Sequence, residues 1–285
     1  MIKFGPSGAC EEFNAQGFKK TSDGAIWLKN KGVDLFEYSF GRGVNISSEK
    51  AIAYGNVFKE NDIELSVHAP YFINLATVEE EKAINNIRYI ETSLKALKEF
   101  GGKRCVFHPG SPLKLDRREA MNILLKSFEN IVQIKNDNGY KDLYLCPETM
   151  GKLAQLGDLE EIIEIVNVGD ENIIPCIDFG HLNARERGLF KSKDDYKRVI
   201  DRLIDGIGEK KTMNMHVHFS KIQYTDKGEL RHLTFDDDVY GPDYEPLMEV
   251  FADYKMTPYV VCESAGTQTR DSLSMKQYYN NYLNK

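Results

Sequence analysis

Short apolar runs alternate with longer amphipathic stretches along most of the chain. The short runs are continuously apolar more often than alternating, which is typical of parallel strands that are buried on both faces. Each is bounded by polar or turn-forming residues. The pattern predicts eight strands, at residues 2–5, 35–40, 63–68, 104–108, 142–148, 173–178, 213–219 and 258–263.

The stretches between the strands show helical periodicity. It is clearest at residues 78–100, where isoleucine, leucine and phenylalanine recur at intervals of three and four, and where Thr77 with Glu80 predicts a capping box. Another helix is expected to start near Asp116 and to end at Asn138-Gly139. Further helices are predicted at about 22–31, 47–61, 159–168, 193–207, 245–254 and 271–283.

Eight strand–helix units in one chain predict an α/β fold, a single (β/α)8 TIM barrel in which residues 1–285 form one catalytic domain. The alternative is an open, doubly wound parallel sheet. Such sheets often carry a glycine-rich phosphate loop after the first strand. Neither a GxGxxG nor a Walker-type sequence follows the first predicted strand here, which favours the barrel.

Composition narrows the class of protein. The 285 residues are 41% hydrophobic, and no apolar run approaches the roughly 18 residues that a membrane span needs. The start of the chain lacks a basic segment followed by a long apolar one, so the expected location is the cytoplasm. Five cysteines are scattered singly, which predicts reduced thiols. The net charge of −7 excludes a protein that is basic all over, but not a local basic groove.

Metal-capable side chains stand at most of the predicted strand ends, where the active site of a barrel forms. One such histidine is more often structural than a ligand, but the same explanation would have to hold at six of eight strands. Mixed imidazole and carboxylate ligands suit zinc, manganese or iron, and their number implies two or three ions. The candidates are His68, His108, Glu148, Asp178, His181, His216, His218 and Glu263, with His232 in the loop after the seventh strand.

Five motifs contain six of these residues: HxxYxINLA from His68 to Ala76, HPGS from His108 to Ser111, PET at Pro147–Thr149, CIDxxH from Cys176 to His181, and CES around Glu263. Together they resemble the endonuclease IV family of apurinic/apyrimidinic endonucleases. Members of that family are zinc-dependent (β/α)8 barrels related to sugar isomerases. The resemblance covers most of the chain.

The resemblance implies three zinc ions and a role for each ligand. His68, His108 and Glu148 would hold the first ion, and Glu148 would bridge to the second. Asp178, a strand-seven histidine and Glu263 would complete the second site, and His181 would hold the third ion. The implied reaction is hydrolysis of the phosphodiester 5′ to an abasic site in DNA, by a hydroxide that bridges two metals near Glu148, with Glu148 and Glu263 as catalytic residues.

Three segments depart from the family pattern, and one of them is the loop after the first strand, which reads GPSG where the family has a histidine-containing GAHxS. Strand seven reads HVHFSK where the family has His-Leu-Asn-Asp, so either His216 or His218 could be the ligand, and an alignment without gaps selects His216 and Lys221. The family's Asp-Arg-His triplet at the third metal corresponds to residues 229–232, where His232 matches and Glu229 is the candidate substitute for the aspartate.

The expected partner is DNA that contains abasic sites, bound by a monomer. Tyr71 matches a position that the family inserts into the minor groove, and Arg42 is the candidate for its inserted arginine. The acidic segment Phe235–Tyr244 does not suit a loop that faces phosphates. That segment and the altered third site favour an alternative, a metal-dependent sugar isomerase or epimerase on the same barrel. A non-catalytic metal-binding protein has no positive signal in the sequence.

Overall fold

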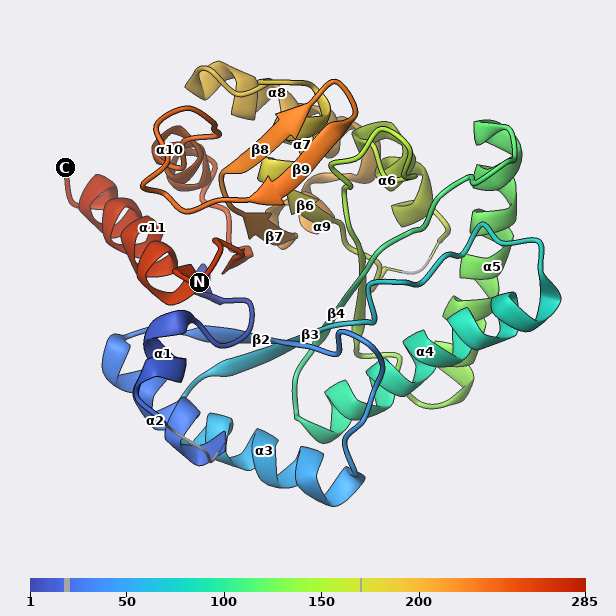
Figure 1. Ribbon diagram of the computed structural model, residues 1–285, viewed down its shortest axis with the longest axis horizontal. Coiled ribbons are helices and arrows are strands. Elements are labelled where there is room, and N and C mark those ends of the chain that lie inside the picture. Colours follow the sequence, from blue (N-terminus) through green and yellow to red (C-terminus); the bar gives the residue numbers. More distant parts are fainter. Residues whose placement is uncertain (18–20, 170) are drawn as a thin grey trace.

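Eight parallel strands alternate with helices around a common axis in the computed structural model, which describes residues 1–17, 21–169 and 171–285 (Figure 1). Each strand lies at one of the predicted positions. The barrel strands are β1 (Lys3–Pro6), β2 (Leu35–Ser39), β3 (Glu64–His68), β4 (Arg104–Phe107), β5 (Tyr144–Pro147), β6 (Cys176–Asp178), β7 (His216–Phe219) and β10 (Tyr259–Cys262).

Two parallel sheets make the barrel wall, with strand orders β1-β10-β7-β6 and β2-β3-β4-β5. Isolated bridges join the sheets at both seams. Ser7 pairs with Glu37 between β1 and β2, and Glu148 pairs with Cys176 between β5 and β6. The wall is therefore closed. The prediction of a (β/α)8 TIM barrel is confirmed, and the open doubly wound sheet is wrong.

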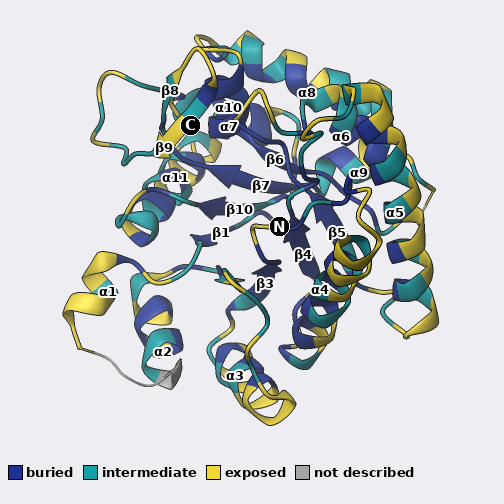
Figure 2. Ribbon diagram, turned by 45° about the vertical axis from the view of Figure 1, so that its right-hand side comes forward, coloured by how far each residue is buried: buried dark blue, intermediate teal, exposed yellow. Residues whose placement is uncertain are grey.

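Helices surround the barrel, and the buried surfaces of strands and helices face one another (Figure 2). All predicted helices are present, with ends shifted by a few residues. Three short helices, α1, α7 and α9, are additional. The helices are α1 (Glu11–Ala15), α2 (Thr21–Lys31), α3 (Ser48–Glu60), α4 (Glu80–Glu99), α5 (Arg117–Asp137), α6 (Leu159–Val166), α7 (Phe179–Arg185), α8 (Lys193–Ile207), α9 (Glu209–Met213), α10 (Glu245–Asp253) and α11 (Gln268–Leu283).

The two predicted helix starts have different outcomes. Asp116 is the N-cap of α5, and its side chain accepts hydrogen bonds from the backbone N–H groups of Arg118 and Glu119. The capping box at Thr77 is wrong, because α4 begins at Glu80 after the N-cap Glu79. The Thr77 hydroxyl instead accepts a hydrogen bond from the N–H of Glu79, which closes a turn ahead of the helix.

A two-stranded antiparallel hairpin follows β7, and the sequence analysis did not predict it. It consists of β8 (Ile222–Thr225) and β9 (Gly228–His232). The hairpin docks on the loop after β5. There the N–H of Glu229 donates to the carbonyl of Gly151 at 3.0 Å, and the backbones of Lys152 and Gly228 form an isolated antiparallel β-bridge. This docking fixes Glu229 and His232 near the carboxyl ends of the barrel strands.

Two expectations from composition can be compared with the structure. Within the described residues, no helix combines the length and the apolar character that crossing a bilayer requires. The five cysteines are buried and free, as expected for reduced thiols.

Candidate metal centre

The carboxyl ends of six barrel strands deliver ionisable side chains to one mouth, as expected for parallel strands that point the same way. The mouth contains a cavity of about 300 Å³. His68 and Asp178 end their strands, while His108, Glu148 and Glu263 follow theirs directly. Side chains far apart in the sequence are thereby brought within a few ångströms of one another.

The first cluster consists of His68, His108 and Glu148, whose ligand atoms lie within 4.8 Å of one another. The Nε2 atom of His68 is 3.0 Å from Glu148 Oε2, and the Nε2 atom of His108 is 3.3 Å from the same oxygen. Both imidazoles therefore converge on one oxygen of a single buried carboxylate.

The second cluster consists of Glu148, Asp178, His218 and Glu263. His218 approaches through Nδ1, which lies 3.0 Å from Glu148 Oε1 and 3.5 Å from Glu263 Oε2. Glu148 thus belongs to both clusters, with Oε2 facing the first and Oε1 facing the second. This is the arrangement expected of a carboxylate that joins two adjacent ions.

The third cluster consists of His181, Glu229 and His232. Glu229 lies between the two rings, with Oε2 3.5 Å from His181 Nε2 and Oε1 3.9 Å from His232 Nε2. The hairpin supplies two of the three members. Glu229 therefore occupies the place that the sequence analysis gave to a substitute for the missing aspartate.

Four of the imidazoles are oriented in the same way. The Nδ1–H of His68 donates to the carbonyl of Ala69 at 2.7 Å, and those of His108 and His181 donate to the carbonyls of Tyr71 and Thr149. His232 makes a hydrogen bond between Nδ1 and the Ser220 hydroxyl at 2.9 Å. A partner on Nδ1 fixes the ring and leaves Nε2 available, which is the usual arrangement of histidines that bind metals.

The local charges keep most of the carboxylates ionised. Burial alone would raise the pKa of Glu148, but the charge of His218 and hydrogen bonds from His108 and His181 hold that pKa well below its usual range. Burial would likewise raise the pKa of Glu263, which the neighbouring imidazole charges lower instead. Burial raises the pKa of Asp178. Ionised carboxylates are the form that binds cations.

The INLA and HPGS segments are joined by a clamp between two loops. The side-chain oxygen of Asn74 accepts from the N–H groups of Ala76 and Ser111, and its amide donates to the carbonyl of Ser111. At Gly110, where φ is +125°, an added Cβ would lie 2.2 Å from Asn74 Oδ1. The clamp fixes the loops that follow His68 and His108 relative to each other.

The two strand-seven histidines lie in different layers. His218 reaches Glu148, whereas His216, which the ungapped alignment selects, lies deeper and contacts Glu37, with Nε2 3.0 Å from Glu37 Oε2. The sequence analysis missed Glu37. A carboxylate inside the apolar run LFEYSF was the available signal, because strand alternation points it into the barrel. Burial lowers the pKa of His216 to about 4, although the charge of Glu37 opposes this shift.

The two predicted DNA-contacting residues lie in neighbouring loops at the rim. Tyr71 is 57% exposed, and its backbone N–H is 3.4 Å from the carbonyl of Gly41. Arg42 follows Gly41 and is exposed. The structure therefore brings the loop after β2 and the loop after β3 together, with both side chains accessible.

Lys221 and the acidic segment neutralise part of each other's charge. Lys221 Nζ lies 3.2 Å from Asp243 and donates to the carbonyl of Asp237 at 2.6 Å. Asp236 pairs with Arg270 at 2.7 Å. Phe235 and Tyr244, at the two ends of the segment, stack on each other and pack against the hydrophobic core. Lys221 therefore binds the acidic segment, and two carboxylates of that segment, Asp236 and Asp243, form ion pairs.

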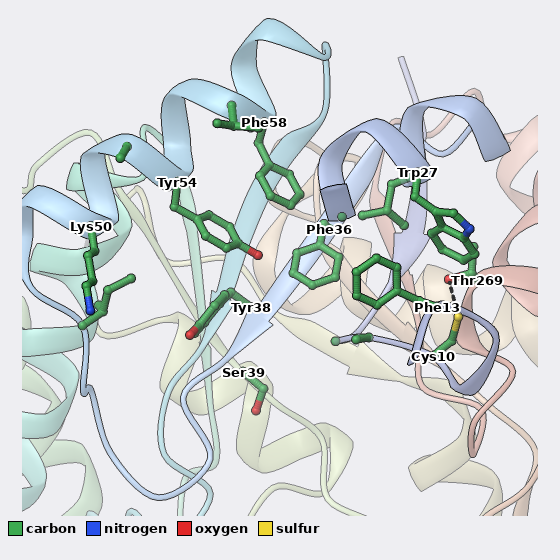
Figure 3. Close-up of a pocket in the computed structure, with 17 residues that line it drawn as sticks. Cys10, Phe13, Trp27, Phe36, Tyr38, Ser39, Lys50, Tyr54, Phe58 and Thr269 are labelled. Atoms are coloured by element: carbon green, nitrogen blue, oxygen red, sulfur yellow. Dashed lines mark hydrogen bonds between the residues drawn. The ribbon is translucent and has the colours of Figure 1, made fainter. Parts of the chain in front are cut away.

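A larger cavity of about 730 Å³ lies outside the barrel wall, between β2 and the helices α1, α2 and α3. Figure 3 shows Phe36, Tyr38 and Tyr54 on one side of it and Phe13 and Trp27 on the other. Its described lining residues include no carboxylate and no imidazole. The chemistry therefore resides in the smaller cavity at the mouth.

The donor sets of the three clusters fit divalent ions of the zinc type. They combine imidazole nitrogens with carboxylate oxygens, a mixture that zinc, manganese and iron accept. Asp178 Oδ2 is buried and has no hydrogen-bond partner among the described residues, although Asp178 Oδ1 accepts from the N–H of His181. A bound cation would satisfy that oxygen.

Comparison with known sequences identifies a family and two kinds of relative, one similar along nearly its whole length and one similar along about half of it. The profile of a family described as a xylose isomerase-like TIM barrel matches residues 26–278. The uncharacterized protein MJ0133 of Methanocaldococcus jannaschii is 33% identical over 284 residues, which cover 98% of this chain and 97% of that protein. A probable endonuclease 4 of Staphylococcus carnosus is 29% identical over 161 residues, 54% of this chain and 51% of that protein. The match thus spans about half the length of that relative.

Solved structures share the fold at lower identity. A D-tagatose 3-epimerase-like protein has a TM-score of 0.72 at 20% identity, with 99% of this chain and 97% of that chain covered. Endonuclease IV of Thermus thermophilus has a TM-score of 0.66 at 17% identity, with 99% of both chains covered. Apart from the uncharacterized protein MJ0133, these relatives and neighbours carry the names of endonucleases or of an epimerase-like protein.

Proposed function

Because the chain belongs to the xylose isomerase-like TIM barrel family, we propose that residues 1–285 form one catalytic domain that hydrolyses the phosphodiester 5′ to abasic sites in DNA. One observation supports this most strongly: three clusters of metal-type ligands meet at a single mouth, and two of them share Glu148. Phosphoryl chemistry uses adjacent cations to stabilise both the attacking and the leaving oxygen.

Two or three divalent ions, with zinc as the expected metal, would supply Lewis acidity and an activated water at the mouth. The residues of the first and second clusters would hold one ion each, with the two oxygens of Glu148 turned to different clusters. Glu263 and Asp178 position the second cluster. His181, Glu229 and His232 would hold the third ion.

The protein's own thiols are poorly placed to act as nucleophiles. Burial raises the pKa of Cys146 and of Cys262 to about 12, and each of the five cysteines is buried. A thiol in that state carries little thiolate at neutral pH. Water is therefore the proposed nucleophile, and the chain's contribution is to bind cations and to place the phosphate.

The rim supports a nucleic-acid partner in two ways. Large apolar side chains stand exposed on loops that surround the mouth, a feature that proteins use as wedges between base steps. These are Tyr71, Phe72, Leu113, Leu153 and Val239. The pairing of Asp236 with Arg270 and of Asp243 with Lys221 also reduces the repulsion that the acidic segment would exert on phosphates.

A second candidate function is epimerisation or isomerisation of a small sugar with one divalent ion. The second cluster favours it, because Glu148, Asp178, His218 and Glu263 form a complete four-ligand set without help from the other clusters. The first and third clusters weigh against it. Five further imidazole and carboxylate side chains converge on the same cavity, and a one-metal reaction leaves them without a role.

The test is incubation of the metal-loaded protein with a duplex that contains one abasic-site analogue. We expect a single break 5′ to the analogue and none in the intact duplex. Glu263→Ala should lower kcat/KM at least about 100-fold, the equivalent of about 3 kcal/mol of transition-state stabilisation. The exposed Glu129 of α5 offers a matched control, Glu129→Ala. Full cleavage by Glu263→Ala, or an intact analogue duplex together with conversion of a ketose, would overturn the proposal.

A further inference from the structure

A second layer of metal-type ligands lies beneath the mouth, inside the barrel. It consists of Glu37 on β2, Cys176 on β6, and His216 and His218 on β7, and all four residues are 0% exposed. One ligand atom from each of Cys176, His216 and His218 lies within 4.8 Å of the others. Glu37 lies outside this group of three but approaches two of its members, from Oε2 to His216 Nε2 at 3.0 Å and from Oε1 to His218 Nε2 at 2.8 Å.

Several polar atoms of this layer lack hydrogen bonds. Glu37 Oε1, both ring nitrogens of His216 and His218 Nε2 are buried and have no hydrogen-bond partner among the residues that the structure describes. The contacts between rings and carboxylate are short, but they do not have hydrogen-bond geometry. A buried polar atom without a partner destabilises the fold, and native interiors contain few such atoms. Glu37 Oε2 differs from these atoms, because it accepts a hydrogen bond from the hydroxyl of Ser66 at 2.8 Å.

We propose that Glu37, Cys176, His216 and His218 form a buried metal site, distinct from the three clusters at the mouth, that binds a divalent ion of the zinc type. A set of one sulfur, two imidazoles and one carboxylate matches the ligand preference of zinc. Zn–N and Zn–O bonds of about 2.0 Å place neighbouring tetrahedral ligand atoms about 3.3 Å apart. The observed separations of 2.8 and 3.0 Å differ from this by a few tenths of an ångström.

Charge balance favours occupation of this site. A thiolate at Cys176 and a carboxylate at Glu37 together carry two negative charges, which a divalent ion cancels. The complex adds no net charge to the barrel interior, so the usual cost of burying an ion is largely avoided. The same ion would satisfy the orphaned atoms of Glu37, His216 and His218 at once.

His218 connects the two layers. Its Nδ1 faces Glu148 and Glu263 at the mouth, and its Nε2 faces Glu37 below. With both layers filled, the ring bridges two cations as an imidazolate, and its additional negative charge is shared between the lower ion and the cation of the second cluster. The lower ion therefore fixes the orientation in which His218 enters the second cluster.

Cobalt substitution tests this site directly, because Cys176 is the only sulfur among all the proposed ligands. The cobalt-loaded protein of residues 1–285 should show a thiolate-to-cobalt charge-transfer band in the near ultraviolet. Cys176→Ser should lose that band and one equivalent of cobalt. The matched control is Cys146→Ser, since Cys146 is equally buried on the neighbouring strand β5 and belongs to none of the ligand groups. That variant should keep both the band and the metal content.

A wild-type protein without the band, or a Cys176→Ser protein that keeps it, would overturn the proposal. If Cys176→Ser does not fold, X-ray absorption at the zinc edge of the wild-type protein gives the same answer. A sulfur neighbour at about 2.3 Å supports the site, and its absence contradicts it. Neither readout depends on DNA cleavage, so failure of the proposed hydrolysis would leave this result unchanged.

Discussion

The Nε2 atom of His68 lies 3.0 Å from Oε2 of Glu148, although 80 positions separate the two residues in the chain. The contact joins the end of β3 to the end of β5, two strands that do not pair with each other. It arises because every strand of a closed parallel barrel ends at the same rim. The same principle places His108 and His218 against that carboxylate.

Gly151→Ala is predicted to remove one metal ion per chain. A Cβ at this position would lie 2.6 Å from Cβ of Glu229 and 3.0 Å from Cδ2 of His181, so the third cluster must open. Gly24→Ala is the matched control, because its nearest neighbour would be Phe13 Cζ at 3.5 Å, an ordinary contact. Elemental analysis of the two zinc-loaded proteins measures the difference. Equal metal content in both variants would show that this cluster binds no ion.

Metal binding is predicted to release protons and to tighten as the pH rises. Burial alone would lower the pKa of His68, but its hydrogen bond with Glu148 and the charges of Glu148 and Glu37 raise that pKa to about 9 in the metal-free protein. The unfolded value is about 6.5. Protonation of His68 therefore stabilises the metal-free fold. This stabilisation is complete below pH 6.5 and is lost as the pH rises through 9.

A cation must displace that proton, so affinity should increase from pH 6.5 to 9 while the metal-free protein becomes less stable. Titration calorimetry at pH 7.5 in two buffers of different ionisation enthalpy counts the protons released, and at least one is expected. The same heat in both buffers would rule out this linkage.

Asn74→Ala is predicted to weaken both the fold and the first cluster. It removes three hydrogen bonds, with the backbones of Ala76 and Ser111, so the free energy of unfolding should fall by about 2–4 kcal/mol at about 0.5–1.5 kcal/mol per bond. Urea denaturation measures this loss. The control is Asn122→Ala on the exposed face of α5, which should have little effect. Wild-type stability in Asn74→Ala would mean that the two loops do not depend on this clamp.

Tyr71→Ala is predicted to weaken binding of abasic DNA without changing stability, since the ring is 57% exposed. Stacking of an aromatic ring on a base is worth about 1–3 kcal/mol, which corresponds to an affinity loss of about 5–150-fold. Fluorescence anisotropy with an abasic duplex measures it. Ile52→Ala on α3, away from the mouth, changes a side chain of similar exposure at 49%. An affinity loss no greater than that of Ile52→Ala would remove Tyr71 from the DNA interface.

The sequence predicts the barrel and most of the mouth for one physical reason. Hydrophobic periodicity locates the strands, and parallel strands end at one rim, so residues such as Glu148 and Glu263 are expected to meet before their distances are known. The hairpin was not predicted because residues 222–232 contain no continuous apolar run. Its position depends on tertiary contacts with Gly151.

Hydrophobic periodicity does not show how deep within the barrel each inward-facing side chain lies. His216 and His218 both face inward, since they are two residues apart, so alternation alone cannot distinguish the upper from the lower layer. The pairing of β7 with its neighbours decides it: His218 lies opposite Asp178 on β6, while His216 lies opposite Cys176. Glu37 was not predicted because it stands in the middle of β2, whereas the predicted ligands stand at or near strand ends.

The central claim is that the mouth of the barrel holds adjacent cations that share Glu148. Crystals of the zinc-loaded protein, measured at the zinc absorption edge, test it most directly through an anomalous difference map. We expect separate peaks in the first and second clusters with the Glu148 carboxylate between them, and a further peak beside Glu229. A map with one mouth peak confined to the second cluster, or with none at the mouth, would contradict it.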